Sequence, residues 1–283
     1  MAATAYQEQV AEPDFPPGRY LELPGRGVTF VRDQPGAVDR RPIVLLHGWT
    51  ATADLNFFKV YRGLASVGRV IAIDQRGHGR GMATRRFRLE DVADDVGATL
   101  EALGIGSAVV VGYSMGGAVA QLVAHRHPTR VSGLVLCATS CRFRRSTEKR
   151  FLWDRVMPVT AAALSLTPDA LRLGLFERFA MTRQASAPQW MLEQISRNDP
   201  AVIVQAGVAI GGFDASPWIA DLPMPVASVV TGADTTVPTR WQQATARRAG
   251  STVFPVDADH RAAVSQPDRF VPALRSAIRH VSR

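Results

Sequence analysis

The sequence lacks most of the features that would point to a membrane, a metal or a disulfide framework. No apolar run reaches the length of about 18 residues that a membrane-spanning helix needs. The two cysteines, Cys137 and Cys141, have no signal peptide beside them and no zinc-site spacing, so we expect free buried thiols and no metal. The amino terminus has no basic segment followed by an apolar one, so we expect a cytoplasmic protein.

Lysine is also scarce, since it occurs only at Lys59 and Lys149, and arginine supplies nearly all of the 33 cations. The net charge of +8 permits anionic partners. One local basic cluster lies at Arg142–Arg150, and we interpret it first as a solvated face that leaves open a weak contact with an anionic membrane surface. No nucleic-acid motif accompanies it, so no nucleic-acid partner is predicted.

Short apolar, β-branched runs alternate with segments of helical period. Such runs are typical of strands covered on both faces, and their alternation with helices predicts an α/β fold with right-handed crossovers. The clearest helical segments are Leu89–Leu103, Gly116–His125 and Pro267–Val281. The expected strands are Gly27–Val31, Ile43–Leu46, Val70–Ile73, Ala108–Val111, Gly133–Leu136, Val226–Val230 and Thr252–Val256.

The alternation stops once, between residues 142 and 220, where apolar helical stretches replace strands. We interpret this segment as a helical cap inserted over the carboxyl ends of the strands, where open α/β sheets bind ligands. Residues 21–141 and 221–283 then form the core, and residues 1–20 are expected to be a flexible tail.

The stretch Gly112-Tyr113-Ser114-Met115-Gly116 lies directly between an expected strand and an expected helix. A G-x-S-x-G in that context predicts a sharp turn that exposes the serine hydroxyl above the sheet. The helix that follows would direct its N-terminal dipole toward negative charge developing there. We therefore take Ser114 as a candidate nucleophile.

A serine nucleophile needs a base, and His260 is the one histidine that follows the last expected strand at the start of a loop. We expect His47 to shape a turn, and His125 and His127 to face away from Ser114 on the helix behind it. The best candidate for the acid is Asp234, 26 residues before the base, with an Asx-turn role as the simpler alternative.

Acyl chemistry also needs donors for an oxyanion. We expect one from the backbone N–H of Met115, next after the candidate nucleophile. The second is expected from the loop after the Ile43–Leu46 strand, at the backbone N–H of Trp49. The Trp49 indole would then be a pocket wall or part of the core.

Taken together, LLHGW, IAIDQRGHGRG, VVGYSMGGAVA, TGADTTVP and DADH resemble the α/β-hydrolase superfamily, in its lipase/esterase and haloperoxidase-like branch. The resemblance spans about residues 27–281 and implies a mostly parallel, doubly wound sheet with an inserted helical cap. It also implies a triad of Ser114, Asp234 and His260 and no cofactor. Two departures stand out, because Asp259 replaces a frequent glycine before the histidine and Arg80 replaces a frequent small hydroxyl residue after His78-Gly79.

The first functional hypothesis is a serine hydrolase that cleaves a carboxylic ester or thioester through an acyl-enzyme, with a small-molecule ester of an apolar acyl group as the substrate. Tyr113, Trp153, Phe176 and Phe179 are the candidate substrate-binding residues, although at helical spacing the cap aromatics would equally well attach the cap to the core. The alternatives are a haloperoxidase-like perhydrolase or acyltransferase with the same triad, and a ligand-binding receptor with vestigial activity. An epoxide hydrolase is disfavoured, because those relatives carry aspartate where this chain has Ser114.

Overall fold

A mostly parallel sheet of eight strands forms the centre of the computed structural model, which describes residues 12–37, 39–143, 152–168, 170–171, 173–174 and 187–283. The strand order is β1-β2-β4-β3-β5-β6-β7-β8; β1 and β2 run antiparallel to their neighbours and the other pairs are parallel. The predicted α/β class is therefore confirmed. The strands are β1 Gly18–Leu23, β2 Gly27–Gln34, β3 Ile43–Leu46, β4 Val70–Asp74, β5 Ala108–Tyr113, β6 Val131–Cys137, β7 Val226–Thr231 and β8 Thr252–Val256.

Strand β1 was not expected, and it corrects the predicted tail of residues 1–20. Residues 18–20 belong to β1, which pairs with β2 through a tight turn at Gly25, whose φ is +72°. The strand escapes detection because it lies at the sheet edge, where only Leu23 is buried and no apolar run is needed. Phe15, just before it, packs its ring edge-on against Trp190. Residues 1–11 lie outside the described part of the chain.

Side chains alternate between two apolar cores, one on each face of the sheet. In β3, Val44 and Leu46 belong to one core, and Ile43 and Leu45 to the other. Because successive side chains of a strand point to opposite faces, a strand covered on both sides needs an unbroken apolar run. Helices α3 and α4 cover the first face, and α1, α2 and α12 cover the second.

The helices of the core begin and end close to the predicted bounds where the apolar stripe is long. Short helices such as α1 and α11 carry too few turns for a period to be recognised. The described core helices are α1 Ala53–Phe57, α2 Tyr61–Leu64, α3 Leu89–Ala102, α4 Met115–Arg126, η1 Pro128–Arg130, α10 Thr239–Arg248, α11 Ala262–Ser265 and α12 Pro267–Val281.

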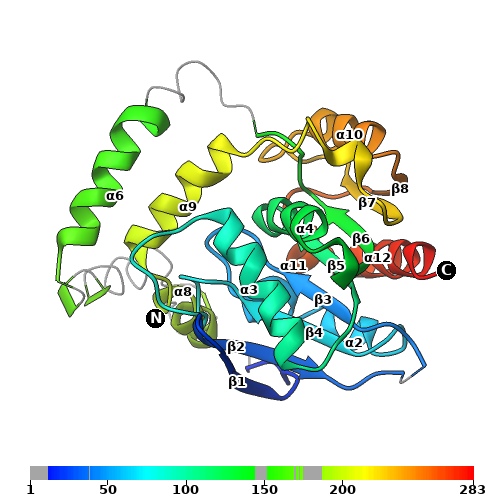
Figure 1. The fold of residues 1–283 in the computed structure, drawn as a ribbon, viewed down its shortest axis with the longest axis horizontal. Helices are drawn as coiled ribbons and strands as arrows, with labels where there is room; N and C mark the ends of the chain where they lie inside the picture. Colours follow the sequence, from blue (N-terminus) through cyan, green and yellow to red (C-terminus); the bar gives the residue numbers. More distant parts are fainter. Residues whose placement is uncertain (1–11, 38, 144–151, 169, 172, 175–186) are drawn as a thin grey trace, which may run out of the picture.

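Between β6 and β7, the described residues form helices that gather at one end of the sheet, on the left in Figure 1. The one β-bridge among them joins Arg142 to Asp214, where the chain leaves and re-enters the core. Within the described ranges, no helix is both long and apolar enough to span a bilayer. The helical elements of this segment are η2 Leu152–Val156, α6 Met157–Leu166, α8 Gln189–Ser196, α9 Pro200–Gly212 and η3 Ile219–Asp221.

Candidate active site

Ser114 lies in a strained turn between β5 and α4. Its φ of 53° is in the left-handed region, which costs a residue other than glycine on the order of 1 kcal/mol or more. The neighbouring strand β6 holds the turn, since Ser114 N–H donates to the Cys137 carbonyl at 2.9 Å and the Thr139 hydroxyl donates to the Ser114 carbonyl at 2.7 Å. The turn is thus fastened through its backbone, and the Ser114 hydroxyl stays available.

The glycines around Ser114 are required by close backbone approach. A Cβ at Gly112 would collide with the carbonyl of Gly116, and a Cβ at Gly116 would collide with the carbonyl of Leu46. A Cβ at Gly117 would collide with the Thr139 side chain. Glycine is therefore required at these three positions, because any side chain there would prevent strand β5 from turning directly into helix α4.

The His260 imidazole joins Ser114 to Asp234. Its Nε2 lies 3.0 Å from Ser114 Oγ, and its Nδ1 lies 2.7 Å from Asp234 Oδ2. An ionised carboxylate only accepts, so Nδ1–H donates to Asp234 and Nε2 is left to accept the Ser114 hydroxyl proton. The His260 side chain is 19% exposed, whereas the Asp234 side chain is fully buried. Loops after β5, β7 and β8 thus bring together residues 114, 234 and 260.

Asp234 is surrounded by hydrogen-bond donors besides the imidazole. The backbone N–H groups of Thr236 and Val237 donate to Oδ1, both at 2.9 Å. The Thr231 hydroxyl and the Gln242 side-chain amide donate to Oδ2 at 2.9 and 3.0 Å. These bonds replace the water that a buried carboxylate loses and orient Oδ2 toward the ring. Sequence reasoning missed Thr231 and Gln242, because nothing in the sequence around either residue indicates a contact with Asp234.

Tyr113 borders the site, but its hydroxyl is bound to the backbone of His260, the candidate base. Its hydroxyl donates to the backbone carbonyl of His260 at 2.6 Å, and its ring packs edge-on against Phe270. Burial raises the pKa of the Tyr113 phenol far above its usual range, so it remains a donor. The predicted substrate-binding residue Tyr113 therefore has its polar group engaged by the protein itself.

The neighbouring aspartates do not compete with Asp234 for the ring. Asp257 pairs with Arg269 at 3.0 Å. Asp259 accepts the backbone N–H of Arg261 at 2.8 Å, and this hydrogen bond holds the pKa of the Asp259 carboxyl below its usual range. Asp259, at the position before His260 where a glycine is frequent, therefore caps the turn that begins there.

A cavity of about 190 Å³ opens beside Ser114 and His260. The loop after β3 forms one wall, because a Cβ built at Gly48 would lie 3.5 Å from Ser114 Cβ. Met115 is the first residue of α4, so its backbone N–H has no partner within the helix. The lining residues are Gly48, Trp49, Ala51, Leu55, Asn56, Tyr113, Ser114, His260, Arg261, Ala263 and Val264.

The aromatic side chains of the segment between β6 and β7 differ in what they contact. The Trp153 ring packs edge-on against Trp49, with ring centres 5.7 Å apart, and so contacts the cavity wall. Trp190, by contrast, packs on Phe15 and Phe58 and attaches α8 to the core. Phe176 and Phe179 lie outside the described residues, as do residues 144–150 of the basic cluster. Arg142, at the start of that cluster, pairs with Asp214.

Two further histidines lie buried beneath the site without contacting Ser114. The Nδ1–H of His47 donates to the Gly48 carbonyl at 2.8 Å, and its Nε2 accepts the backbone N–H of Gln75 at 3.0 Å. Burial lowers the pKa of His47 to about 4 and that of His78 to about 3, so both rings are neutral. The expected turn-shaping role of His47 agrees with these contacts.

The histidines of α4 and its end face away from the nucleophile, as expected. His125 stacks on Trp218 with ring centres 4.3 Å apart, and His127 contacts Asp94 at 2.9 Å. Cys137 and Cys141 are buried and unbridged, as the sequence predicted. Among the described residues, no group of three or more His, Cys, Asp or Glu side chains is arranged to hold a metal ion.

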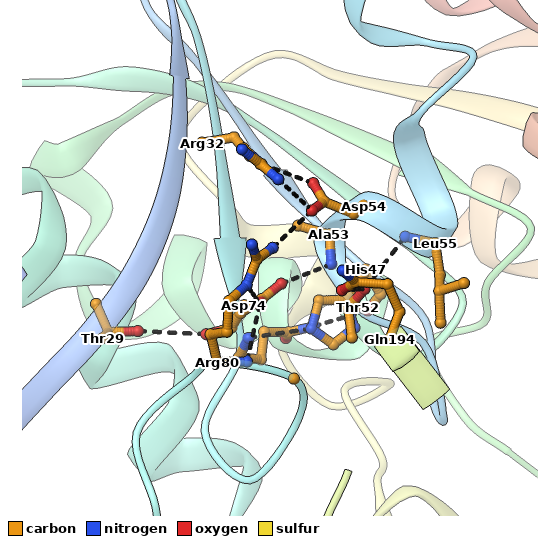
Figure 2. A network of polar contacts seen from close by, with 12 residues as sticks. Thr29, Arg32, His47, Thr52, Ala53, Asp54, Leu55, Asp74, Arg80 and Gln194 are labelled. Atoms are coloured by element: carbon orange, nitrogen blue, oxygen red, sulfur yellow. Dashed lines mark hydrogen bonds and ion pairs between the residues drawn. The ribbon is translucent and has the colours of Figure 1, made fainter. Parts of the chain in front are cut away.

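A buried ionic network near β4 was not foreseen (Figure 2). Asp54 accepts from Arg32 and Arg80, both at 2.6 Å, and Asp74 accepts the backbone N–H groups of Ala53 and Arg80 at 2.8 and 3.0 Å. Burial raises the pKa of Asp74, and the Arg80 guanidinium opposes that shift. The Arg80 guanidinium also lies 3.6 Å above the centre of the Phe30 ring. Arg80, a departure from the family pattern, thus has its own carboxylate partners.

Comparison with known proteins places these features in a family. The chain is 37% identical over 151 residues to a pimeloyl-[acyl-carrier protein] methyl ester esterase of Chromobacterium violaceum, covering 52% of this chain and 54% of that protein. It is 32% identical over 160 residues to a non-heme chloroperoxidase of Streptomyces lividans, covering 56% of this chain and 52% of that protein. The chain thus spans about half the length of these relatives.

The fold is shared more widely than the sequence. A crystal structure of a hydrolase from Pseudomonas aeruginosa matches with a TM-score of 0.74 over 92% of this chain and 98% of that one, at 22% identity. The model of the alpha/beta hydrolase fold family matches residues 41–198, which include the turn around Ser114 and the loop after β3. The chain belongs to the alpha/beta hydrolase fold family.

Proposed function

We propose that this α/β hydrolase is a serine esterase that cleaves a carboxylic ester, or a thioester by the same steps, through an acyl-enzyme. The observation that supports the proposal most is the pair of hydrogen bonds from the His260 imidazole, 3.0 Å to Ser114 Oγ and 2.7 Å to Asp234 Oδ2. A nucleophile, a base and an orienting acid within hydrogen-bond reach are the parts that acyl transfer requires.

In the first half of the cycle, Ser114 Oγ attacks the acyl carbon while its proton passes to His260 Nε2. The carbonyl oxygen becomes an oxyanion, which the backbone N–H groups of Met115 and Trp49 stabilise. The intermediate then collapses, the bond to the leaving group breaks, and the imidazolium gives its proton to the departing alkoxide or thiolate. Asp234 stays ionised and holds the ring in the tautomer that these transfers need.

In the second half, water attacks the acyl-enzyme and gives its proton to His260. The acid product leaves and Ser114 recovers its proton. The lining of the cavity beside Ser114 is mostly apolar, and Trp49, Leu55 and Val264 contribute to it. We therefore propose a small apolar acyl group as the substrate portion bound there.

A fluorophosphonate probe tests this proposal directly. We expect the wild type to be labelled on Ser114, as measured by mass spectrometry of its peptides, and to hydrolyse short p-nitrophenyl esters. Ser114→Ala, folded to the same melting temperature, should lose labelling and at least about 10³-fold in kcat. A correctly folded wild type that resists labelling and turns over no ester contradicts the hydrolase, and is the result expected of a binding protein.

A second candidate, a perhydrolase, is favoured by the similarity to the chloroperoxidase. In that reaction hydrogen peroxide replaces water, attacks the acyl-enzyme and leaves as the peracid, with no change to the triad steps. Peracid production from acetic acid and hydrogen peroxide would identify it. If peroxide leaves the products of ester turnover unchanged, the perhydrolase is excluded.

A further inference from the structure

The loop between β3 and α1, residues 47–52, is held by two different parts of the molecule. Its first half is held by the core. Gln75 Nε2 donates to the His47 carbonyl at 2.7 Å, and the Gly48 N–H donates to Asn56 Oδ1 at 2.7 Å. All of these partners lie in β4, α1 or the loops beside them.

The second half of the loop is held from the cap side. The Trp49 indole N–H donates to the Ile203 carbonyl of α9 at 2.8 Å. Asn198 Nδ2 donates to the Thr50 carbonyl at 3.2 Å. The Thr52 hydroxyl donates to Gln194 Oε1 of α8 at 3.1 Å, as drawn in Figure 2. Residues 49–52, which carry one of the two proposed oxyanion donors, thus take these side-chain anchors from residues 194–203.

Asn198 occupies the central position in this set. It is 1% exposed, and its Oδ1 accepts the backbone N–H of Gly79 at 3.0 Å while its Nδ2 donates to Thr50. One partner only donates and the other only accepts, so the amide orientation follows from the contacts themselves. Asn198 therefore links the loop after β3 to the loop after β4 at a buried position.

The backbone of Thr50 is strained, so the hydrogen bond from Asn198 matters for the conformation of the loop. Its φ of 64° lies in the left-handed region, where a β-branched residue is disfavoured and persists only under outside restraint. The Asn198 bond supplies a restraint to the carbonyl of the same residue. Trp49 directly precedes Thr50 in the chain, so a change in the Thr50 backbone re-aims the backbone of Trp49.

We propose that Asn198 is a positioning residue, which holds the loop after β3 so that the Trp49 N–H points at the oxyanion formed on Ser114. The inference rests on the proposed esterase function and assigns part of the oxyanion geometry to a residue of the cap segment. A displaced oxyanion donor weakens stabilisation of the transition state more than binding of the substrate.

The test compares Asn198→Ala with Gln205→Ala. Gln205 lies on α9 and also joins cap to core, accepting the Phe87 N–H at 2.7 Å and donating to the Arg85 carbonyl at 3.0 Å. None of its hydrogen bonds is made with residues 47–52. With a p-nitrophenyl ester, Asn198→Ala should lower kcat roughly 10- to 100-fold with KM within about twofold. Its inhibition constant for an alkylboronic acid, whose adduct carries an oxyanion, should rise by a similar factor. Gln205→Ala should leave kcat and the inhibition constant within about twofold.

Asn198→Asp removes the side-chain donor but keeps the acceptor and the shape of the side chain. It keeps an acceptor for Gly79 and places a carboxylate oxygen against the Thr50 carbonyl, so we expect a loss at least as large as in Asn198→Ala. Equal effects of Asn198→Ala and Gln205→Ala on kcat overturn the inference, as does a lowered kcat with unchanged boronate affinity.

Hydrogen exchange tests the same inference without activity. The amides of residues 49–52 should exchange at least about tenfold faster in Asn198→Ala than in wild type or Gln205→Ala. Unchanged exchange there overturns the positioning role. A wild type that neither hydrolyses ester nor reacts with fluorophosphonate refutes the proposed function instead, and faster exchange in Asn198→Ala would still support the restraint on the loop.

Discussion

Two buried groups of carboxylates and histidines lie near the carboxyl ends of the parallel strands, and they differ in how the two residue types are paired. In the first, Asp234 is bonded to His260, and the remaining donors to the carboxylate are uncharged. In the second, Asp54 and Asp74 accept hydrogen bonds from arginine side chains and backbone amides, and His47 forms hydrogen bonds with backbone groups.

The difference shows that partners, and not residue type, give these side chains their roles. A carboxylate held by arginines acts as a structural cross-link between segments. A carboxylate directed at an imidazole sets its tautomer and leaves the other ring nitrogen free for proton transfer. His47 has the same ring, but both of its nitrogens are occupied by backbone groups.

Neutralising one carboxylate of each group tests most directly whether the two groups have different roles. Asp234→Asn should lower kcat for a p-nitrophenyl ester by roughly 10⁴-fold, because the amide favours the wrong tautomer of His260. Asp54→Asn should instead lower the free energy of unfolding by about 3 kcal/mol or more. The substitution removes the carboxylate charge that the partly buried guanidinium groups of Arg32 and Arg80 share.

Steady-state kinetics and urea unfolding of both variants measure the two effects. The folded fraction of Asp54→Asn should keep kcat within about threefold of wild type, since Asp54 contacts no member of the triad. If that kcat falls as far as in Asp234→Asn, the proposed separation of roles is wrong.

The buried histidines of the second group should make the stability of the protein depend on pH. Burial lowers the pKa of His47 to about 4 and that of His78 to about 3, whereas in the unfolded chain both titrate near 6.5. The unfolded state therefore binds protons first, so stability is complete above pH 6.5 and falls as the pH drops toward these values. The loss approaches about 3 kcal/mol for His47, because lowering a pKa by one pH unit corresponds to about 1.4 kcal/mol.

Urea unfolding between pH 7 and 4.5 measures this dependence. His78→Phe removes one of the two titrations and places an apolar ring beside Phe87, so its stability should fall less steeply over the same range. Equal slopes in wild type and His78→Phe would show that His78 is not buried in its neutral form.

The smallest expected effect concerns Tyr113, which supports the base through one hydrogen bond to the His260 carbonyl. Tyr113→Phe removes that bond and leaves the packing against Phe270 in place. A loss worth about 1 kcal/mol corresponds to a roughly fivefold lower kcat, with KM unchanged. A raised KM with unchanged kcat would instead support the substrate-binding role that the sequence suggested for Tyr113.

Much of the core could be predicted because its signals are local. Buried parallel strands need continuous apolar runs, and the turn around Ser114 needs glycines at 112, 116 and 117 because backbone and side-chain atoms occupy the space of their Cβ atoms. Strand β1 was missed because an exposed edge strand needs no apolar run. The role of Arg80 could not be predicted, since its partner Asp54 lies 26 residues away in the sequence.

The order of motifs along the chain was enough to nominate Ser114, Asp234 and His260, because each one follows the end of a strand and parallel strands deliver their ends to one edge of the sheet. The contacts of Gln242, Thr231 and Asn198 depended on the tertiary structure alone. A glutamine or asparagine has no sequence pattern for a partner many residues away, and its role follows from which donors and acceptors folding leaves unpaired beside it. For this protein, the local sequence around the turn identified Ser114 as the candidate nucleophile, and the packing of distant loops decided what holds it in place.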